Sequence, residues 1–311
     1  MSVPDSWRFR AGAYNRSVLG EILTAIATPF SADGSLQLSR FRELARFLVE
    51  NGSDGIVVAG TTGEAPTLSD EERLVLFAAA VEEVGDRATV VAGTGTYSTG
   101  HSVHLTEQAH ALGVDGFLVV TPYYNKPPAR GLVEHFKAIA SVSDRPIIVY
   151  NIPSRVVINI EPETLAQLGE IPTVTAVKQA NPDLAQAARI LDETDLALYA
   201  GDDDLLLPFL GLGGTGGVCV HTHIVGPQVQ ELVRRFRDGD LDGARALDEE
   251  LRPAIELLRV VVNPISIKAA LNLLGHEVGG LRLPLVDASA EELAQVRSCL
   301  ERLGLLAAAP A

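Results

Sequence analysis

Short apolar runs alternate with amphipathic segments along most of the chain. The apolar runs are typical of buried strands, and the segments between them repeat their apolar residues at helical spacing. The pattern predicts strands at 22–30, 55–60, 89–95, 116–122, 146–153, 174–180, 196–201 and 216–222. It predicts helices at 39–51, 69–84, 99–112, 130–142, 161–168, 183–192, 204–211 and 227–237.

Eight successive βα units predict a (β/α)8 TIM barrel. A doubly wound sheet is the alternative, but eight units at this even spacing favour a closed barrel. In such barrels the chemistry lies at the C-terminal ends of the strands. Polar and reactive residues do follow the predicted strands, at 60–64, 121–125, 150–155, 178 and 201–203.

The alternation stops near residue 240. Segments 241–261, 264–274 and 289–303 have helical patterns with no strand between them, which predicts a C-terminal helical appendage. We therefore expect an N-terminal arm at 1–19, a (β/α)8 catalytic barrel at 20–240 and a C-terminal helical region at 241–311. Within the barrel, Ser69-Asp70-Glu71-Glu72 predicts a helix start with an N-cap and an acidic first turn.

Composition narrows the possible partners. The chain of 311 residues is 47% hydrophobic and carries a net charge of −15. Such a charge argues against non-specific binding to nucleic acid or to anionic membranes, and an anionic substrate would need a local positive site. The two cysteines, Cys219 and Cys299, cannot form a disulfide framework, so a reducing cytoplasm is expected. No apolar stretch is long enough to span a bilayer, and residues 1–20 lack the apolar core of a signal peptide.

Lys178 is the strongest chemical candidate. The 25 basic residues include four lysines and therefore 21 arginines, and Lys178 lies within the apolar run 174–180. Burial disfavours a lysine's charge, and a desolvated lysine can act as a free amine that attacks a carbonyl. The alternative is a strand-end lysine that reaches the barrel rim or pairs with a carboxylate.

Other strand ends offer matching chemistry, and each also has a purely structural interpretation. Tyr150 could be a rim aromatic, or it could shuttle protons beside a lysine amine. Segment 60–63, Gly-Thr-Thr-Gly, could be a turn, or it could present N–H and hydroxyl groups to a carboxylate. Arg155 could be solvated, or it could clamp a second carboxylate. Tyr123 and Tyr124 could pack in their loop, or Tyr124 could reach a neighbouring subunit.

Two further motifs are weaker. Segment 211–216 matches G-x-G-x-x-G, but its glycines precede a strand instead of opening a helix, so a turn is expected. His221 and His223 form an H-x-H pair, and a barrel lysine can be a carbamylated bridge in metal-dependent hydrolases. The predicted first, fifth and sixth strands contain no histidine, which argues against that hydrolase pattern. We therefore expect no metal site.

Together these motifs resemble the dihydrodipicolinate synthase/N-acetylneuraminate lyase family of class I aldolases. The resemblance runs from about residue 20 to about 303. It rests on segment 60–64 (Gly-Thr-Thr-Gly-Glu), segment 150–153 (Tyr-Asn-Ile-Pro), Val177-Lys178 and segment 263–268 (Asn-Pro-Ile-Ser-Ile-Lys). Thr61-Thr62, segment 121–127 and Ser154-Arg155 favour the synthase branch.

The resemblance implies a Schiff-base reaction. It makes Lys178 the residue that forms an imine with pyruvate, and Tyr150 the proton donor and acceptor. Thr61 would relay protons between Tyr150 and Tyr124, the latter donated by the adjacent subunit of a dimer. The substrate-binding residues implied are Thr62 and the backbone near Val218 for pyruvate, Arg155 for the carboxylate of aspartate semialdehyde, and Gly201 as a wall of the site.

The expected activity is the condensation of pyruvate with L-aspartate 4-semialdehyde to 4-hydroxy-tetrahydrodipicolinate, without a cofactor beyond the covalent imine. Alternatives are a family aldolase acting on a sugar acid, of the N-acetylneuraminate or 2-keto-3-deoxygluconate type, and a non-catalytic barrel that binds a keto acid. The resemblance also implies a homotetramer built as a dimer of dimers. Tyr97 and His101 replace the asparagine and glutamate of lysine-sensitive members, whereas Tyr123 matches them, so inhibition by L-lysine is not implied.

Overall fold

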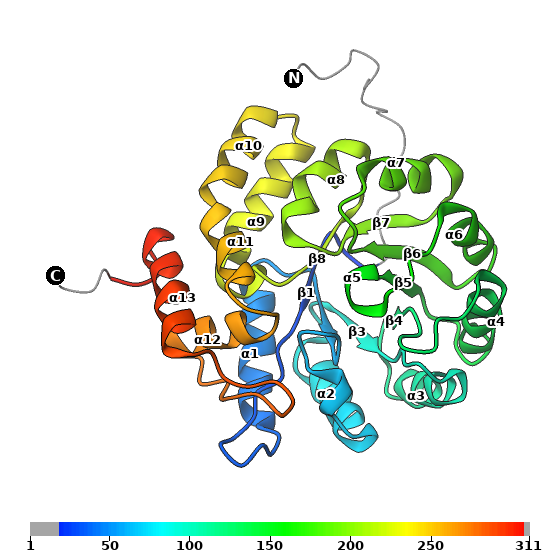
Figure 1. Ribbon diagram of the computed structural model, residues 1–311, viewed down its shortest axis with the longest axis horizontal. Helices are drawn as coiled ribbons and strands as arrows, with labels where there is room; N and C mark the ends of the chain where they lie inside the picture. Colours follow the sequence, from blue (N-terminus) through cyan, green and yellow to red (C-terminus); the bar gives the residue numbers. More distant parts are fainter. Residues whose placement is uncertain (1–18, 308–311) are drawn as a thin grey trace.

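A computed structural model describes residues 19–307 and shows a closed barrel of eight parallel strands, in sequence order β1 to β8. Helices surround the barrel, and the last helices stand together at one side of it (Figure 1). The predicted (β/α)8 TIM barrel with a C-terminal helical appendage is therefore confirmed. The strands are β1 (Ile22–Ala25), β2 (Gly55–Val58), β3 (Thr89–Gly93), β4 (Gly116–Val120), β5 (Ile147–Asn151), β6 (Val174–Gln179), β7 (Ala197–Ala200) and β8 (Gly216–Cys219).

The helices agree closely with the predicted ranges in the first half of the chain. The predicted start at Ser69 is confirmed, because Ser69 and Glu72 form a capping box in which each side chain bonds the other's backbone N–H. The barrel helices are α1 (Leu38–Glu50), α2 (Asp70–Val84), α3 (Thr99–Ala111), α4 (Ala129–Ala140), α5 (Pro153–Val156), α6 (Pro162–Gly169), α7 (Leu184–Glu193), α8 (Leu206–Leu212) and α9 (Thr222–Arg237).

Three helix predictions need correction. Helix α9 begins at Thr222, five residues before the predicted start at 227, and continues past non-helical dihedrals at Val225 and a proline at Pro227. The short helix α5 was not expected, since four residues carry no periodic pattern. The predicted segment 241–261 is divided at Leu251 into two helices. The C-terminal helices are α10 (Leu241–Glu250), α11 (Arg252–Arg259), α12 (Ile265–Leu273) and α13 (Ala290–Arg302).

Strand residues alternate between the barrel interior and the surrounding helices. On β6, Ala176 belongs to the interior cluster, whereas Val177 belongs to the cluster beneath the helices. On β5, Ile148 and Tyr150 are interior in the same way. Lys178 therefore follows Ala176 toward the inside of the barrel. Other interior side chains of this cluster are Leu23, Val57, Val91, Leu118, Tyr199 and Val218.

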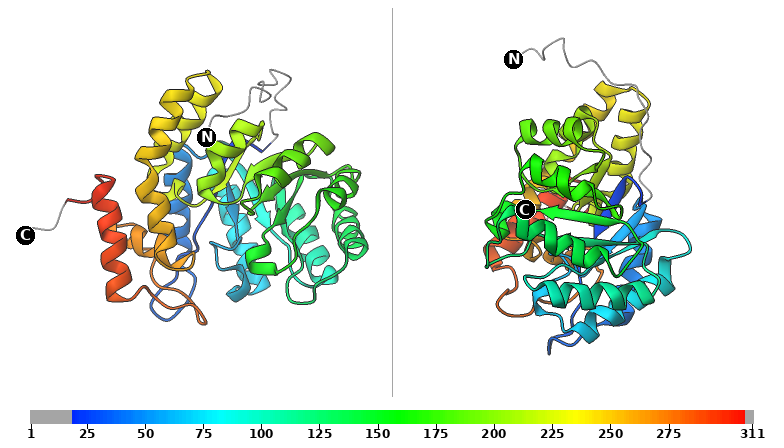
Figure 2. Two further views of the ribbon diagram at one scale, coloured as in Figure 1. Left: turned by 45° about the horizontal axis from the view of Figure 1, so that its top comes forward. Right: turned by 90° about the vertical axis from the view of Figure 1, so that its right-hand side faces the viewer.

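The C-terminal helices share one apolar cluster with the helices of the barrel. Figure 2 shows α13 as the outermost of them, beyond α11 and α12. The boundary expected at residue 240 stays a prediction. The expected N-terminal arm at 1–19 lies outside the described residues except for Leu19, which is buried. No helix within residues 19–307 is long and apolar enough to cross a membrane.

A buried ion pair ties the C-terminal region to the loop after β2. Lys268 of α12 donates hydrogen bonds to Glu64 Oε1 and to the carbonyl oxygen of Thr28, both at 2.9 Å, and also to the carbonyl of Gly280. The other oxygen of Glu64 accepts the backbone N–H of Arg282 at 3.1 Å. Burial lowers the pKa of Lys268, and the Glu64 carboxylate opposes that shift. Both charges are thus buried but fully hydrogen-bonded, which is the condition under which a buried pair is tolerated.

His223 joins the start of α9 to the loop after β1. Its Nδ1 donates to the carbonyl of Val220 at 2.7 Å, and its Nε2 accepts the backbone N–H of Ala27 at 3.1 Å. Both ring nitrogens are therefore used by the fold in the neutral form. The side chain is fully buried, and this burial lowers the pKa of His223 to about 4.

We expect Lys268→Met to lower the free energy of unfolding by about 3–5 kcal/mol, because it leaves the Glu64 carboxylate buried without its partner. Denaturant titration measures this loss. Lys137→Met is the matched control, since Lys137 pairs with Glu134 at 2.9 Å on the surface and should cost less than about 1 kcal/mol. Equal losses in the two variants would contradict the assigned role.

We expect acid to destabilise the fold through His223. Its folded pKa lies below the ordinary value of 6.5, so its contribution is complete above pH 6.5 and is lost as the pH falls through about 4. The contribution is at most about 3 kcal/mol. Free energies of unfolding measured between pH 7 and pH 4 should show a smaller pH slope in His223→Gln than in the parent. The slope of a His104→Gln control, altered on the exposed face of α3, should stay at the parent value.

Candidate active site

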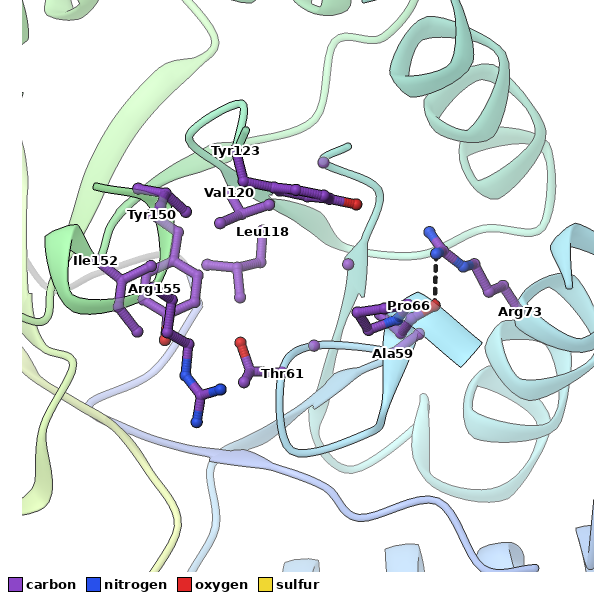
Figure 3. A pocket seen from close by; sticks show the side chains of 15 residues that line it. Ala59, Thr61, Pro66, Arg73, Leu118, Val120, Tyr123, Tyr150, Ile152 and Arg155 are labelled. Atoms are coloured by element: carbon purple, nitrogen blue, oxygen red, sulfur yellow. Dashed lines mark hydrogen bonds between the residues drawn. The ribbon is translucent and has the colours of Figure 1, made fainter. Parts of the chain in front are cut away.

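A cavity of about 240 Å³ opens at the carboxyl ends of β2 to β5. Figure 3 shows Thr61 and Arg155 on one side of it, close to Tyr150, and Arg73 on the opposite side. Its walls also include Tyr123 and the apolar side chains of Leu118, Val120 and Ile152. Three of the residues predicted from the sequence, Thr61, Tyr150 and Arg155, therefore line a single cavity.

Lys178 lies beside Tyr150 because of the register between β5 and β6. The two residues are direct partners in the parallel ladder, and the Lys178 Nζ atom is 4.2 Å from the centre of the Tyr150 ring. Each side chain is only 4% exposed. Among residues 19–307, the lysine ion pairs are those of Lys137 and Lys268. The amine of Lys178 therefore lies over an aromatic ring, without a direct ion pair to a described carboxylate. Burial raises the pKa of Asp202, and the Lys178 amine opposes that shift electrostatically.

A network of side-chain amides supports the ends of β5 and β6. Asn151 and Gln179 directly follow Tyr150 and Lys178, and Asn151 Nδ2 donates to Gln179 Oε1 at 2.9 Å. Gln179 in turn donates to Gln186 of α7 at 3.0 Å. This network was not predicted from the sequence, although amides that directly follow the two key residues in buried strands were a usable signal. Further members are Asn159 and Asn181.

The loop after β2 places Thr61 in the cavity and buries Thr62. Thr62 is 2% exposed, and its Oγ1 accepts a hydrogen bond from Asn263 Nδ2 at 2.9 Å. The loop is fixed from a second side, since the Thr28 hydroxyl donates to the carbonyl of Gly63 at 2.7 Å. Glu64 then takes a left-handed conformation, with φ of 55°, before its carboxylate meets Lys268.

Arg155 lies in α5 and is exposed at the cavity mouth. Its Nη2 donates to the carbonyl oxygen of Asn263 at 3.0 Å. A guanidinium has five N–H donors, so most of them are free to bind a carboxylate. Asn263 therefore contacts both the loop after β2 and the arginine after β5.

The remaining predicted residues lie around this centre. Val218 is fully buried in the interior cluster that contains Tyr150. Gly201 follows β7, and a Cβ there would come within 2.8 Å of Ala180, which leaves no room for a larger residue. Tyr124 is 93% exposed and is not among the residues that line the cavity, whereas its neighbour Tyr123 lines it. A role for Tyr124 in a neighbouring subunit's site stays a prediction.

Arg73 lines the cavity but was not predicted from the sequence. It lies in α2, is buried, and donates from Nη2 to the carbonyl of Ala65 at 2.6 Å. Its Nε and Nη1 atoms have no hydrogen-bond partner within the described part of the chain. The sequence around Arg73 does not indicate a site residue, because an arginine beside the acidic first turn of a helix is common on protein surfaces. Nearby, Tyr97 stacks edge-on against Tyr123, and His101 Nε2 lies 2.9 Å from Asp70.

The H-x-H segment is poorly suited to a metal ion. Asp203, Cys219 and His221 place potential ligand atoms within 4.8 Å of one another. However, Asp203 Oδ1 already accepts the backbone N–H groups of Val220 and His221, at 2.7 and 2.8 Å. Burial raises the pKa of Cys219 well above its usual value, which opposes formation of the thiolate that binds metal ions. Both ring nitrogens of His223 are already hydrogen-bonded to the backbone, at Ala27 and Val220.

The G-x-G-x-x-G segment forms the turn between α8 and β8, as expected. Gly213 ends α8 with φ of 108°, and the backbone then enters β8 at Gly216. Such a left-handed helix end is the usual place for glycine. The segment does not open a helix after a strand, so it lacks the geometry of a dinucleotide site.

The similarity to known proteins covers nearly all the residues that the structure describes. Residues 18–303 match the Dihydrodipicolinate synthetase family. A 4-hydroxy-tetrahydrodipicolinate synthase from Moorella thermoacetica is 50% identical over 289 residues, which make up 92% of this chain and 99% of the relative.

Solved structures agree with the sequence relatives. DHDPS from Cyanidioschyzon merolae, crystallised with lysine bound, has a TM-score of 0.91 and 44% identity, covering 93% of this chain and 99% of that one. A chloride-inhibited dihydrodipicolinate synthase from Acinetobacter baumannii, complexed with pyruvate, has a TM-score of 0.90 and 33% identity, covering 93% and 100%. With its barrel, its motifs and these matches in agreement, the chain belongs to the Dihydrodipicolinate synthetase family.

Proposed function

We propose that this protein condenses pyruvate with L-aspartate 4-semialdehyde and forms 4-hydroxy-tetrahydrodipicolinate, the first committed intermediate of diaminopimelate and lysine. The observation that carries the proposal is the Lys178 amine, 4.2 Å from the ring of Tyr150. Tyr150 lines the cavity together with Thr61 and Arg155. The relatives named 4-hydroxy-tetrahydrodipicolinate synthase support the choice of acceptor.

The reaction begins with covalent capture of pyruvate. The neutral amine of Lys178 attacks the keto carbon, and the resulting carbinolamine loses water as Tyr150 supplies a proton to the leaving hydroxyl. The protonated imine acidifies the methyl group of pyruvate. The Tyr150 phenolate takes one methyl proton, which gives an enamine. The enamine carbon then attacks the aldehyde carbon of the second substrate, and Tyr150 returns the proton to the aldehyde oxygen. Attack of that substrate's own amine on the imine carbon closes the ring and releases Lys178.

The other residues bind and orient the substrates in this proposal. Thr62 and the backbone near Val218 hold the carboxylate end of pyruvate, while Arg155 binds the carboxylate of aspartate semialdehyde. Thr61 relays protons between Tyr150 and a Tyr124 from the neighbouring subunit. The residue after β7, Gly201, keeps one wall of the site free of side chains.

We infer a homotetramer built as a dimer of dimers, because Tyr124 is exposed on its own subunit and the family resemblance assigns it to a neighbour's site. No cofactor is required beyond the imine of Lys178. A cytoplasmic location is proposed from the two cysteines, which are both free and buried.

Borohydride reduction in the presence of pyruvate should add the mass of one reduced pyruvate imine to Lys178. Peptide mass spectrometry locates the adduct. Lys178→Arg should show no adduct and should lose at least about 10⁴-fold in activity, since a guanidinium cannot act as the nucleophile. An adduct on Lys126, Lys137 or Lys268, or none in the parent protein, would overturn the mechanism.

The acceptor is tested by comparing substrates. We expect turnover of pyruvate with aspartate semialdehyde, and no cleavage of N-acetylneuraminate or 2-keto-3-deoxygluconate, because the Arg155 site fits a short carboxylated aldehyde. Initial rates of pyruvate loss or release measure all three reactions. Cleavage of a sugar acid with no reaction of aspartate semialdehyde would favour the sugar-acid aldolase. Pyruvate capture without turnover of any acceptor would favour a keto-acid-binding barrel.

A further inference from the structure

Asn263 lies between α11 and α12, outside the barrel sequence, yet it contacts two loops of the active site. Its side-chain Nδ2 donates to Thr62 Oγ1 at 2.9 Å. Its main-chain carbonyl accepts Arg155 Nη2 at 3.0 Å. The side chain is thus directed to the residue proposed for pyruvate, and the main chain to the residue proposed for the second substrate.

The direction of the hydrogen bond from Asn263 determines whether the Thr62 hydroxyl can donate its proton to a substrate. A hydroxyl has one proton to donate and lone pairs that accept. Because the Asn263 amide donates to it, an acceptor site on Oγ1 is filled and the Thr62 proton is free to point elsewhere. Thr62 is buried, so the orientation is not averaged by surrounding water. A hydroxyl held as a donor suits a carboxylate, which only accepts.

The amide oxygen of Asn263 shows that this orientation of the side-chain amide is energetically unfavourable on its own. Asn263 Oδ1 is buried and has no hydrogen-bond partner among the described residues. An unsatisfied buried acceptor is destabilising and calls for an explanation in a native structure. The reverse amide orientation would let Thr62 donate to Oδ1, but it would remove the Thr62 proton from the substrate.

The position of Asn263 is fixed by the C-terminal region. Ser266 Oγ bonds the backbone N–H and the carbonyl of Val261, each at 3.1 Å, and so holds the turn that precedes α12. One turn further on, Lys268 is anchored to Glu64, at the end of the same loop that carries Thr62. Two hydrogen bonds thus join the α12 region to the loop after β2. One connects Asn263 to Thr62, and the other connects Lys268 to Glu64.

The geometry points to Asn263 as a positioning residue that sets the polarity of the Thr62 hydroxyl, so that Thr62 donates to the carboxylate of the keto acid. This inference rests on the proposed function, in which Thr62 binds pyruvate. It adds a residue of the C-terminal region to the determinants of keto-acid binding. Asn263 itself need not touch the substrate for this role.

Two substitutions distinguish the hydrogen-bonding role of the Asn263 side chain from its role in packing. They are Asn263→Ala and Asn263→Asp. Alanine removes the donor but leaves the Thr62 proton free, so we expect a rise in the half-saturating pyruvate concentration of about threefold to tenfold. Aspartate has almost the shape of asparagine but can only accept, so it draws the Thr62 proton toward itself. We expect the aspartate variant to raise that concentration on the order of 10- to 100-fold, more than alanine does.

The measurement is the pyruvate dependence of borohydride trapping at Lys178, which needs no second substrate. The same two substitutions are made in a Thr62→Val background, where no hydroxyl remains to be oriented. There we expect Asn263→Asp and Asn263→Ala to have little further effect, as a double-mutant cycle shows. The KM for aspartate semialdehyde at saturating pyruvate should change little in either variant, since the main-chain carbonyl that holds Arg155 is retained.

Asn272→Ala is the matched control, because Asn272 lies in α12 and, within residues 19–307, its side chain is hydrogen-bonded to the backbone of Gly279 and not to the active-site loops. Its pyruvate dependence should equal that of the parent, and thermal unfolding checks that every variant is folded. If Asn263→Ala does not fold, Asn263→Leu takes its place.

The inference is overturned if Asn263→Asp is no worse than Asn263→Ala, as a purely structural role predicts. It is also overturned if the aspartate effect persists in the Thr62→Val background, which would indicate charge repulsion alone. Failure of the parent protein to trap pyruvate would instead refute the proposed function.

Discussion

The register between β5 and β6 is the constraint on which the active site depends. In a closed barrel every second strand residue must face inward, and the pairing of Tyr150 with Lys178 puts a phenol and an amine side by side in that interior. A shift of β6 by one residue would turn Lys178 toward the surrounding helices and leave Tyr150 without its partner. The amides of Asn151 and Gln179, one residue further along, bond each other across the same pair of strands and so oppose such a shift.

Two kinds of polar contact hold the site, and they differ in charge. Behind Tyr150 and Lys178 the contacts are neutral amides, which place no additional charge beside the reacting amine. The loop after β2 is instead held by the buried Lys268–Glu64 pair, whose two side chains do not line the cavity. The amine of Lys178 thus lies in the barrel interior, while Arg155 supplies positive charge at the mouth.

The sequence was sufficient to predict the barrel and the central pair, since both follow from short-range periodicity. All eight strands were located, and Lys178 stood out because a lysine is rare in an apolar run. The contacts that complete the site could not be predicted in that way. Arg73 enters the cavity from α2, and Asn263 reaches Thr62 across 201 residues of sequence. Such contacts depend on how distant helices pack, which local patterns do not encode. The early start of α9 could not be predicted either, because a proline such as Pro227 usually marks the first turn of a helix, whereas here it lies inside one.

The shared apolar cluster of barrel and C-terminal helices has a consequence for how this protein can change over evolutionary time. Recombination between relatives works best where few contacts cross the exchange point. Here residues 261–282 supply Asn263, Lys268 and Arg282 to the loop after β2. A crossover near residue 240 would therefore combine the loop after β2 of one relative with the α12 region of another, and their contacting residues would not have evolved together. The C-terminal region is expected to be inherited with the barrel as one unit, and new substrate preferences to arise by point substitution instead of by exchange of modules.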